Sequence, residues 1–117
     1  PQSELAWVAV AARDAERVMA GVARGTFRDG GTCEFMLVVA DAWQQRGIGT
    51  RLMRALMDEA ARRGHPRIVG RVLATNGNML DFVRALGFSV EDQPEEPAVK
   101  RVVCLHSRAA ASPAPAT

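Results

Sequence analysis

The sequence predicts an α/β fold, a sheet of mixed strand direction flanked by helices, and three observations support this class. Short turns separate the first apolar runs of the chain, which is typical of an antiparallel meander. After Gly47 the spacing of apolar residues changes from strand-like to helical. The passage from Cys33 to Ala74 then reads strand, helix, strand, which indicates a parallel crossover.

Three strands are expected before the first helix. Charged residues from Arg13 to Glu16 interrupt the first apolar run, and Asp29-Gly30-Gly31 is a strong turn signal. The expected strands are Leu5–Ala12, Arg17–Thr26 and Thr32–Val39.

Two helices and three further strands follow. From Gly47 to Arg63, apolar residues recur at helical spacing, and Gly64 and Pro66 end the pattern. The other expected elements are a strand at Arg67–Ala74, a helix at Asn78–Leu86, and strands at Phe88–Val90 and Val99–Leu105. The predicted order is therefore β-β-β-α-β-α-β-β.

The length and composition indicate one globular domain. The chain has 117 residues, of which 48% are hydrophobic, and we expect the domain to cover residues 1–106. Residues 107–117 are rich in Ala, Ser and Pro, so they are expected to form a disordered tail.

Charge and cysteine usage argue against several classes of partner. The net charge of +2 gives no reason to expect nucleic acid, and no apolar run is long enough to span a membrane. No signal peptide opens the sequence. Cys33 and Cys104 have neither a second Cys nor a His at ligand spacing, so neither a metal site nor a disulfide framework is expected. The cytoplasm is the simplest compartment for such a chain.

The segment from Gln44 to Thr50 carries the main functional signal. It joins a strand to a helix, and Gly47 and Gly49 allow the backbone to come close to a ligand. The unpaired N–H groups of the first helical turn, the helix dipole and Arg46 together favour a phosphate. This pattern leaves open a nucleotide site, a different phosphate ligand, or a helix start that binds nothing.

Specific residues argue against two kinds of nucleotide site, the P-loop and the dinucleotide-binding turn. A P-loop requires a lysine after its last glycine, and here Thr50 and Arg51 follow Gly49. A dinucleotide site requires a third glycine, and that position holds Leu52.

The same segment resembles the Q/R-x-x-G-x-G/A motif of the GNAT N-acetyltransferase superfamily. The matching residues run from Gln44 to Gly49, and Asn76 and Leu86-Gly87-Phe88 resemble further family features. Within the superfamily the chain is most similar to the C-terminal acetyltransferase domain of bacterial protein lysine acetyltransferases. The resemblance implies a GNAT-like mixed sheet and acetyl-CoA as co-substrate.

One part of the family pattern has no counterpart in the sequence. The family fold begins with a strand and two helices, which line one side of the acceptor groove, whereas this chain begins at the second family strand. We therefore expect either a fragment of a longer protein or a neighbouring chain that covers the gap. An exposed sheet edge would allow a homodimer.

Glu34 is the candidate general base for such a reaction. An amine of reference pKa about 10.4 arrives protonated and must lose a proton before it attacks a thioester. Glu34 is the only charged residue between Thr32 and Ala40, and it shares a strand face with the apolar Met36 and Val38. A carboxylate among apolar neighbours suits a base, while a solvated edge residue is the alternative. The resemblance favours the base.

The resemblance also implies roles for backbone groups and for the leaving thiolate. The Val38 N–H would polarise the thioester carbonyl, and Val38 and Val39 would pair with the pantetheine arm. The residues expected to bind acetyl-CoA are Val38, Val39, Gln44, Gln45, Arg46, Gly47, Ile48, Gly49, Thr50, Asn76 and Met79. Asn76 could equally be a helix N-cap. Many members of the superfamily use a tyrosine near the last helix as general acid, and the resemblance puts Val83 at that place. The chain contains no tyrosine, so water or the ammonium product would protonate the thiolate.

The expected function is therefore transfer of an acetyl group from acetyl-CoA to an amine, most simply a protein lysine. Two alternatives stay open at this stage. The acceptor could be a small-molecule amine, or the chain could be a regulatory module that binds acetyl-CoA without catalysis.

Overall fold

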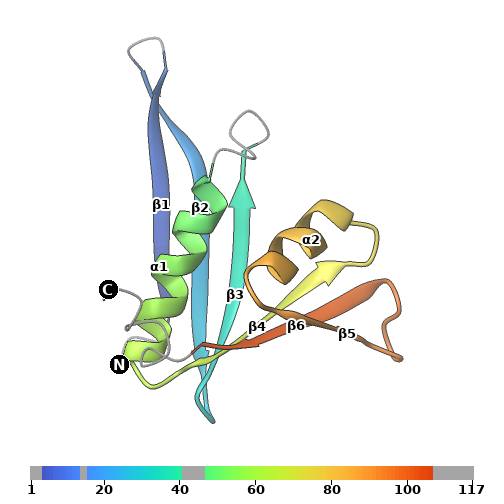
Figure 1. Ribbon diagram of the computed structural model, residues 1–117. Coiled ribbons are helices and arrows are strands. Elements are labelled where there is room, and N and C mark those ends of the chain that lie inside the picture. The colour runs from blue at the N-terminus through green and yellow to red at the C-terminus, as the bar shows by residue number, and fades with distance from the viewer. Residues whose placement is uncertain (1–3, 14–15, 41–46, 107–117) are drawn as a thin grey trace.

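The computed structural model describes residues 4–13, 16–40 and 47–106, which form one six-stranded sheet and two helices (Figure 1). The elements are β1 (Glu4–Arg13), β2 (Glu16–Arg28), β3 (Thr32–Val39), α1 (Ile48–Arg62), β4 (Arg67–Leu73), α2 (Gly77–Ala85), β5 (Ser89–Asp92) and β6 (Val99–Leu105). This order confirms the predicted α/β class and the predicted succession of elements. The expected tail at 107–117 lies outside the described residues.

The boundaries differ from the predictions mainly in the first hairpin. β1 extends to Arg13 and β2 begins at Glu16, and these two residues pair across the hairpin. β2 also continues to Arg28, which pairs with Thr32. The predicted break therefore narrows, because the backbone pairing of the two strands continues past the apolar runs from which the strands were predicted.

The sheet has the strand order β1-β2-β3-β4-β6-β5. The β1–β2–β3 meander and the β4–β6–β5 group are antiparallel, and β3 and β4 form the parallel pair between them. The predicted crossover is thus confirmed. That parallel pair is short, since it comprises only Thr32, Cys33 and Glu34 opposite Arg67, Ile68 and Val69.

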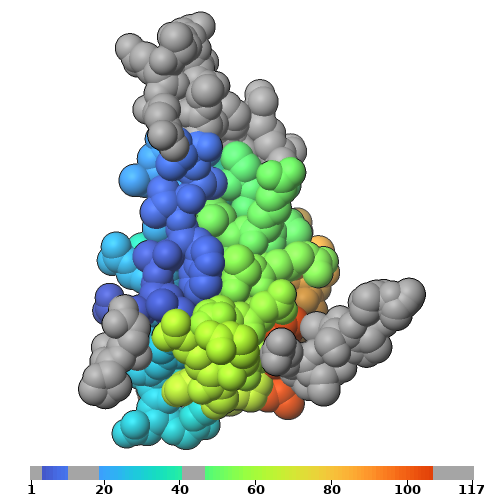
Figure 2. Space-filling view, turned by 90° about the vertical axis from the view of Figure 1, so that its left-hand side faces the viewer, coloured from blue at the N-terminus to red at the C-terminus, as the bar shows by residue number. Residues whose placement is uncertain are grey.

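Both helices lie on the same face of the sheet, α1 over β1 to β3 and α2 on the side of the β4–β6–β5 group, where it contacts β5 (Figure 1). The core between these layers holds buried side chains from both helices and from the facing residues of the strands: Ala23, Cys33, Leu52, Met53, Leu56, Met57, Ala60, Ile68, Val72, Leu80, Val83, Phe88 and Val102. Figure 2 shows β1 beside α1, on the surface that faces the viewer. On the opposite sheet face, Val8, Met36 and Val38 are about half exposed.

β3 and β4 separate beyond their three paired residues, and Phe35 occupies the point of separation. A Cβ atom on Gly70 of β4 would lie 2.4 Å from Cε2 of Phe35, so the ring rests directly on the Gly70 backbone. The ring also meets Phe88 edge-on, with centroids 5.5 Å apart. A bulky ring on one strand and a glycine on the next therefore open the sheet at this level.

Within the described ranges, neither helix has the length and apolar character needed to cross a membrane.

Candidate active site

Two clefts meet where β3 and β4 separate. The helix-side cleft, of about 550 Å³, lies between β3, the start of α1 and the start of α2. Its lining residues are Leu37, Val39, Gly47, Gly49, Thr50, Asn76, Asn78, Met79, Asp81 and Phe82. The strand-side cleft, of about 570 Å³, includes residues of the exposed sheet face, among them Glu4, Arg24, Thr26, Glu34, Met36 and Arg71. Leu37, Asn76 and Met79 line both clefts, so a molecule in one cleft can reach a molecule in the other.

The start of α1 forms one wall of the helix-side cleft. Gly47 holds the N-cap position in a left-handed conformation with φ of 81°, which favours glycine. Its carbonyl accepts the first helical hydrogen bond, from the Arg51 N–H at 3.1 Å. The N–H groups of the residues between them have no acceptor within the helix, and the first turn carries no acidic side chain. This arrangement can bind an anion such as a phosphate.

Gly49 brings α1 close to α2. A Cβ atom at Gly49 would lie 3.3 Å from Cζ of Phe82 on α2 and 3.6 Å from Cδ2 of Leu37. The absence of a side chain therefore sets the separation of the two helices as well as the width of the cleft. The sequence analysis explained Gly49 by the close approach of its backbone to a ligand. The contact with Phe82 is a second reason for a glycine at this position.

Asn76 is the N-cap of α2. Its Oδ1 accepts a hydrogen bond from the Met79 N–H at 3.2 Å, which is the structural role that the sequence left open. The side chain is exposed at the junction of the two clefts. Because the cap uses the oxygen, the amide NH₂ is left as a donor for a ligand.

The backbone of β3 corrects the predicted role of Val38. The Ala40 N–H donates to the Ala20 carbonyl at 2.9 Å, and the Gly31 carbonyl accepts from the Arg67 N–H at 3.1 Å. Since successive residues of a strand direct their backbone groups to opposite edges, even-numbered residues of β3 bond to β2 and odd-numbered ones face β4. The Val38 N–H is therefore directed to Val22 of β2.

Leu37 directs its N–H to the open edge, the same edge that Val39 faces further along the strand. It lies beyond the last rung of the β3–β4 pairing, which is Glu34 with Val69. Its side chain contributes to both clefts. The sequence missed Leu37 because the alternation along a strand does not reveal which edge is paired, and the hairpin register supplies that information.

Glu34 lies in the strand-side cleft on the face shared with Met36 and Val38, as predicted. Its surroundings differ from the apolar ones expected. The Arg28 Nε donates to Glu34 Oε1 at 2.8 Å, and the Arg28 Nη2 lies 2.7 Å from the same oxygen. The Glu34 side chain keeps 41% of its surface exposed. The two-residue extension of β2 to Arg28 brings this arginine beside the carboxylate.

Other predicted site residues divide into three groups. Val39, Gly47, Gly49, Thr50, Asn76 and Met79 come together in the helix-side cleft. The Ile48 side chain packs against the core, while its backbone N–H belongs to the first turn of α1. Gln44, Gln45 and Arg46 lie outside the described residues.

Several lining residues were not predicted as part of the site. Asn78, Asp81 and Phe82 line the helix-side cleft from α2, and Arg24 and Arg71 line the strand-side cleft. The Asn76 cap motif could have identified the first turn of α2. No local signal marks the two arginines, because β2 and β4 bring them to the cleft from distant parts of the sequence.

Both thiols are held in the protonated form by their surroundings. Burial, with a smaller contribution from the charge of Glu34, raises the pKa of Cys33 to about 11. Burial also raises the pKa of Cys104. Within the described part of the chain, no three potential metal ligands cluster together.

Comparison with known proteins gives the family to which this fold and these clefts belong. The profile described as "Acetyltransferase (GNAT) family" matches residues 1–88. The chain belongs to this family, whose members use acetyl-CoA as co-substrate and transfer its acetyl group to an acceptor amine.

Individual proteins resemble the chain to different degrees. Acetyltransferase PA5475 of Pseudomonas aeruginosa is 33% identical over 96 residues, which cover 81% of this chain and 52% of that protein. The chain thus spans about half the length of this curated relative.

Solved structures show the same fold at lower identity. The GNAT domain of S. lividans PAT has a TM-score of 0.73 and 22% identity, with 87% of this chain and 60% of that chain covered. The paia N-acetyltransferase from Thermoplasma acidophilum, in complex with coenzyme A, has a TM-score of 0.71 and 19% identity, with 85% and 60% covered.

Proposed function

We propose that this chain transfers the acetyl group of acetyl-CoA to a protein lysine by direct attack, with Glu34 as general base. The observation that carries the proposal is the meeting of the two clefts at Leu37, Asn76 and Met79. In this assignment acetyl-CoA enters from the helix side, and the acceptor amine enters from the strand side.

The residues of the helix-side cleft fit the parts of acetyl-CoA. The N–H groups at the start of α1, from Ile48 to Thr50, would hold the pyrophosphate. The open edge of β3 would pair with the amide groups of the pantetheine arm, in the manner of an added strand. The Asn76 amide would donate to the same arm. In the cofactor, the thioester supplies an activated acetyl group.

Two groups would act on the reaction itself. Glu34, directly or through a water, would accept the proton that the acceptor ammonium must lose. The Leu37 N–H would donate to the carbonyl oxygen as its charge develops, the role expected of Val38 from the sequence. The C–N bond then forms and the C–S bond breaks.

The departing thiolate must gain a proton. Val83, at the position where relatives place a tyrosine, is fully buried and has no proton to give. After attack the nitrogen still carries an extra proton, which would pass to the thiolate directly or through water. The products are then an acetylated amine and CoA with a neutral thiol, and Glu34 gives its proton to solvent.

The Arg28–Glu34 ion pair bears on how the base works. The Arg28 guanidinium occupies one side of the carboxylate, with Nη2 at 2.7 Å from Glu34 Oε1. An acceptor ammonium would replace Arg28 beside Glu34, because both are cations that require the same partner. The base would thus bind its substrate before it accepts the proton.

The test separates binding from chemistry. Titration calorimetry with acetyl-CoA and desulfo-CoA measures binding to the helix-side cleft. Thiol release in the presence of a lysine-containing protein measures acetyl transfer. Glu34→Gln should bind acetyl-CoA with unchanged affinity and lower turnover by roughly 10²–10⁴-fold. Glu91→Gln is the matched control, since Glu91 is also an exposed strand carboxylate paired with an arginine, Arg101, at 3.2 Å.

Each other outcome selects a different function. Binding without thiol release would support a regulatory module that binds acetyl-CoA. Release with small amines only would give a small-molecule N-acetyltransferase. If acetyl-CoA does not bind at all, the proposal is wrong.

We also propose that the chain acts in the cytoplasm and forms a homodimer through the edge strand β1. The free thiols suit a reducing compartment. β1 has a sheet neighbour on one side only, so a second copy could pair with its other edge. A sedimentation experiment that shows only a monomer at micromolar concentration would contradict the proposed homodimer.

A further inference from the structure

The charged residues of the strand-side cleft are not all matched by partners. Four charged side chains line it: Glu4, Arg24, Glu34 and Arg71. Glu34 is paired with Arg28, Arg71 lies 2.5 Å from Glu96, and Glu4 has an interaction of its own. Among the residues that the structure describes, Arg24 takes part in no ion pair, although it lies in the same cleft.

The strand register explains why Arg24 has no ion pair among the described residues. On the exposed face it stands between Ala6 of β1 and Met36 of β3, and neither can neutralise it. The next row along the same face holds Val8, Val22 and Val38, which are also apolar. On β2, Thr26 lies between Arg24 and Arg28, and Glu34 of β3 lies opposite Thr26. The Glu34 carboxylate bonds to Arg28 and not to Arg24.

The same register fixes how far Arg24 lies from the proposed base. Glu34 pairs with Thr26, and Arg24 is therefore its diagonal neighbour. Diagonal neighbours on adjacent strands are roughly 7–8 Å apart at their Cα atoms, within reach of long side chains. An amine at Glu34 would thus place other groups of the same molecule beside the Arg24 guanidinium.

We propose that the acceptor carries a carboxylate next to its reactive amine, and that Arg24 binds this carboxylate. The inference rests on the proposed function, since it assumes that the strand-side cleft receives the acceptor. A guanidinium offers paired donors that match a carboxylate, and the two residues directly opposite Arg24, Ala6 and Met36, carry no carboxylate. An acidic residue beside the target lysine and the carboxylate of a free amino acid share this chemistry.

The first experiment varies the acceptor and Arg24 together. Two peptides differ only in whether Glu or Gln flanks the lysine, and kcat/KM is measured for each. The wild type should prefer the acidic peptide by about fivefold, as expected of one exposed ion pair, mainly through KM. Arg24→Gln should remove the preference, and Arg24→Lys should keep part of it.

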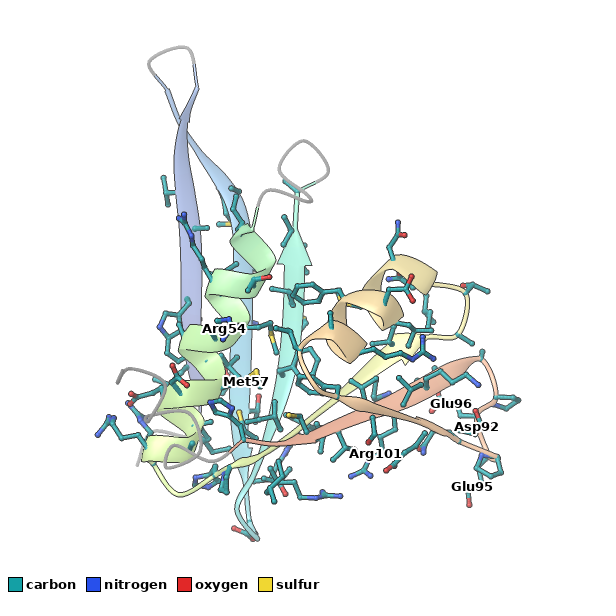
Figure 3. All side chains as sticks on the ribbon, viewed as in Figure 1. Arg54, Met57, Asp92, Glu95, Glu96 and Arg101 are labelled. Carbon is teal, nitrogen blue, oxygen red and sulfur yellow. The ribbon has the colours of Figure 1, made fainter. Side chains whose placement is uncertain are left out.

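Arg54→Gln is the matched control. Arg54 is likewise an exposed arginine without an ion pair among the described residues, but it lies on α1, on the other side of the sheet (Figure 3). It should leave the preference unchanged. Raising the salt concentration should weaken the preference in the wild type and have no such effect in Arg24→Gln.

Charge reversal gives the sharper result. Arg24→Glu should prefer a peptide in which Arg flanks the lysine, because the sign of the site is inverted. L-lysine and 1,5-diaminopentane differ by one carboxylate. Comparing their rates shows whether the carboxylate that Arg24 binds belongs to a free amino acid. Preference for the carboxylate in either pair supports the proposal, and preference in neither pair overturns it.

Failure of this inference can be told apart from failure of the proposed function. Equal rates for all acceptors, unaffected by Arg24→Gln, would leave acetyl transfer intact and overturn the role of Arg24. If no amine is acetylated, the proposed function fails, and fluorescence anisotropy of the two peptides with protein bound to desulfo-CoA decides the inference. Equal binding, or no binding of the acidic peptide, would overturn it.

Discussion

The two halves of β3 differ in what lies beside them. From Thr32 to Glu34 the strand pairs with β2 on one edge and β4 on the other, and Cys33 is fully buried there. From Phe35 to Val39 it keeps β2 but separates from β4, and Leu37 lines both clefts. The strand is continuous, so the difference comes from its neighbours.

The comparison shows how a continuous strand can serve both stability and binding. The paired half closes the sheet and contributes to the core. The open half directs backbone donors and acceptors to the space between β3 and β4, where a ligand can satisfy them. Phe35 and Gly70 mark the boundary between the halves, since the ring lies against the glycine backbone.

The largest expected effect comes from removing one donor in the open half. Leu37→Pro lacks the N–H that faces the open edge, while the bonds from β2 to Met36 and Val38 remain. We expect kcat to fall by roughly 10²–10³-fold, as for other lost oxyanion donors.

Two variants control for side-chain loss and for the strand itself. Leu37→Ala keeps the N–H and should lose much less activity than Leu37→Pro. Val38→Pro removes a donor that points to β2, and it should lower the melting temperature. Equal activity of the Leu37→Pro and Leu37→Ala proteins would contradict the assignment of Leu37.

The next effect concerns the boundary. Gly70→Ala places a Cβ 2.4 Å from the Phe35 ring, and we expect a loss of about 1–3 kcal/mol in the free energy of unfolding together with weaker acetyl-CoA binding. Phe35→Leu in the same protein should restore part of the stability, because it removes the clashing ring.

Gly77→Ala is the control for this change. Nothing lies within 4 Å of a Cβ at Gly77, so chemical denaturation should find no loss of stability there. If Gly70→Ala were as stable as Gly77→Ala, the Phe35 contact would not be what separates the strands.

A smaller effect separates the two roles of Asn76 at the junction of the clefts. Asn76→Ser keeps a cap oxygen for the Met79 N–H but has no amide donor. We expect nearly unchanged stability and about fivefold weaker acetyl-CoA binding, the effect of one hydrogen bond. Asn76→Ala should lose both binding and about 1 kcal/mol of stability. Thermal melting and calorimetry measure the two quantities, and equal acetyl-CoA affinity in all three proteins would leave Asn76 as a cap only.

The smallest effect is a pH dependence of stability, which arises in the paired half of β3. The pKa of Cys33 is raised from 9.0 to about 11 by burial and by Glu34, so the unfolded chain gives up this proton more readily than the folded one. The stabilisation is therefore complete below pH 9 and is lost as the pH rises from 9 towards 11.

The measurement is the melting temperature at pH 8 and pH 10.5. Cys33→Ala should be less stable at both pH values, and its melting temperature should fall less between them than that of the wild type. Cys104→Ala serves as the control at a less buried thiol. The Cys33 thiol of the folded protein should also react slowly with iodoacetamide at pH 8.

Much of the fold could be predicted because its signals are local. The apolar residues of α1 recur every three to four positions, and Leu52, Leu56 and Ala60 are indeed buried. The strand runs and the glycine turns also depend on near neighbours in sequence. The end of β2 was predicted two residues too early, since its pairing with Thr32 depends on β3.

The sequence by itself determined the order of the elements and the glycine turn at the start of α1, since both depend on a few consecutive residues. Only the tertiary structure decided that Leu37 rather than Val38 faces the open edge, because that choice depends on the register of β3 against β2. The same register placed Arg28 on Glu34 and left Arg24, in the strand-side cleft, without an ion pair to any residue that the structure describes. Residues on different strands meet only through pairing, and pairing is a property of the whole sheet.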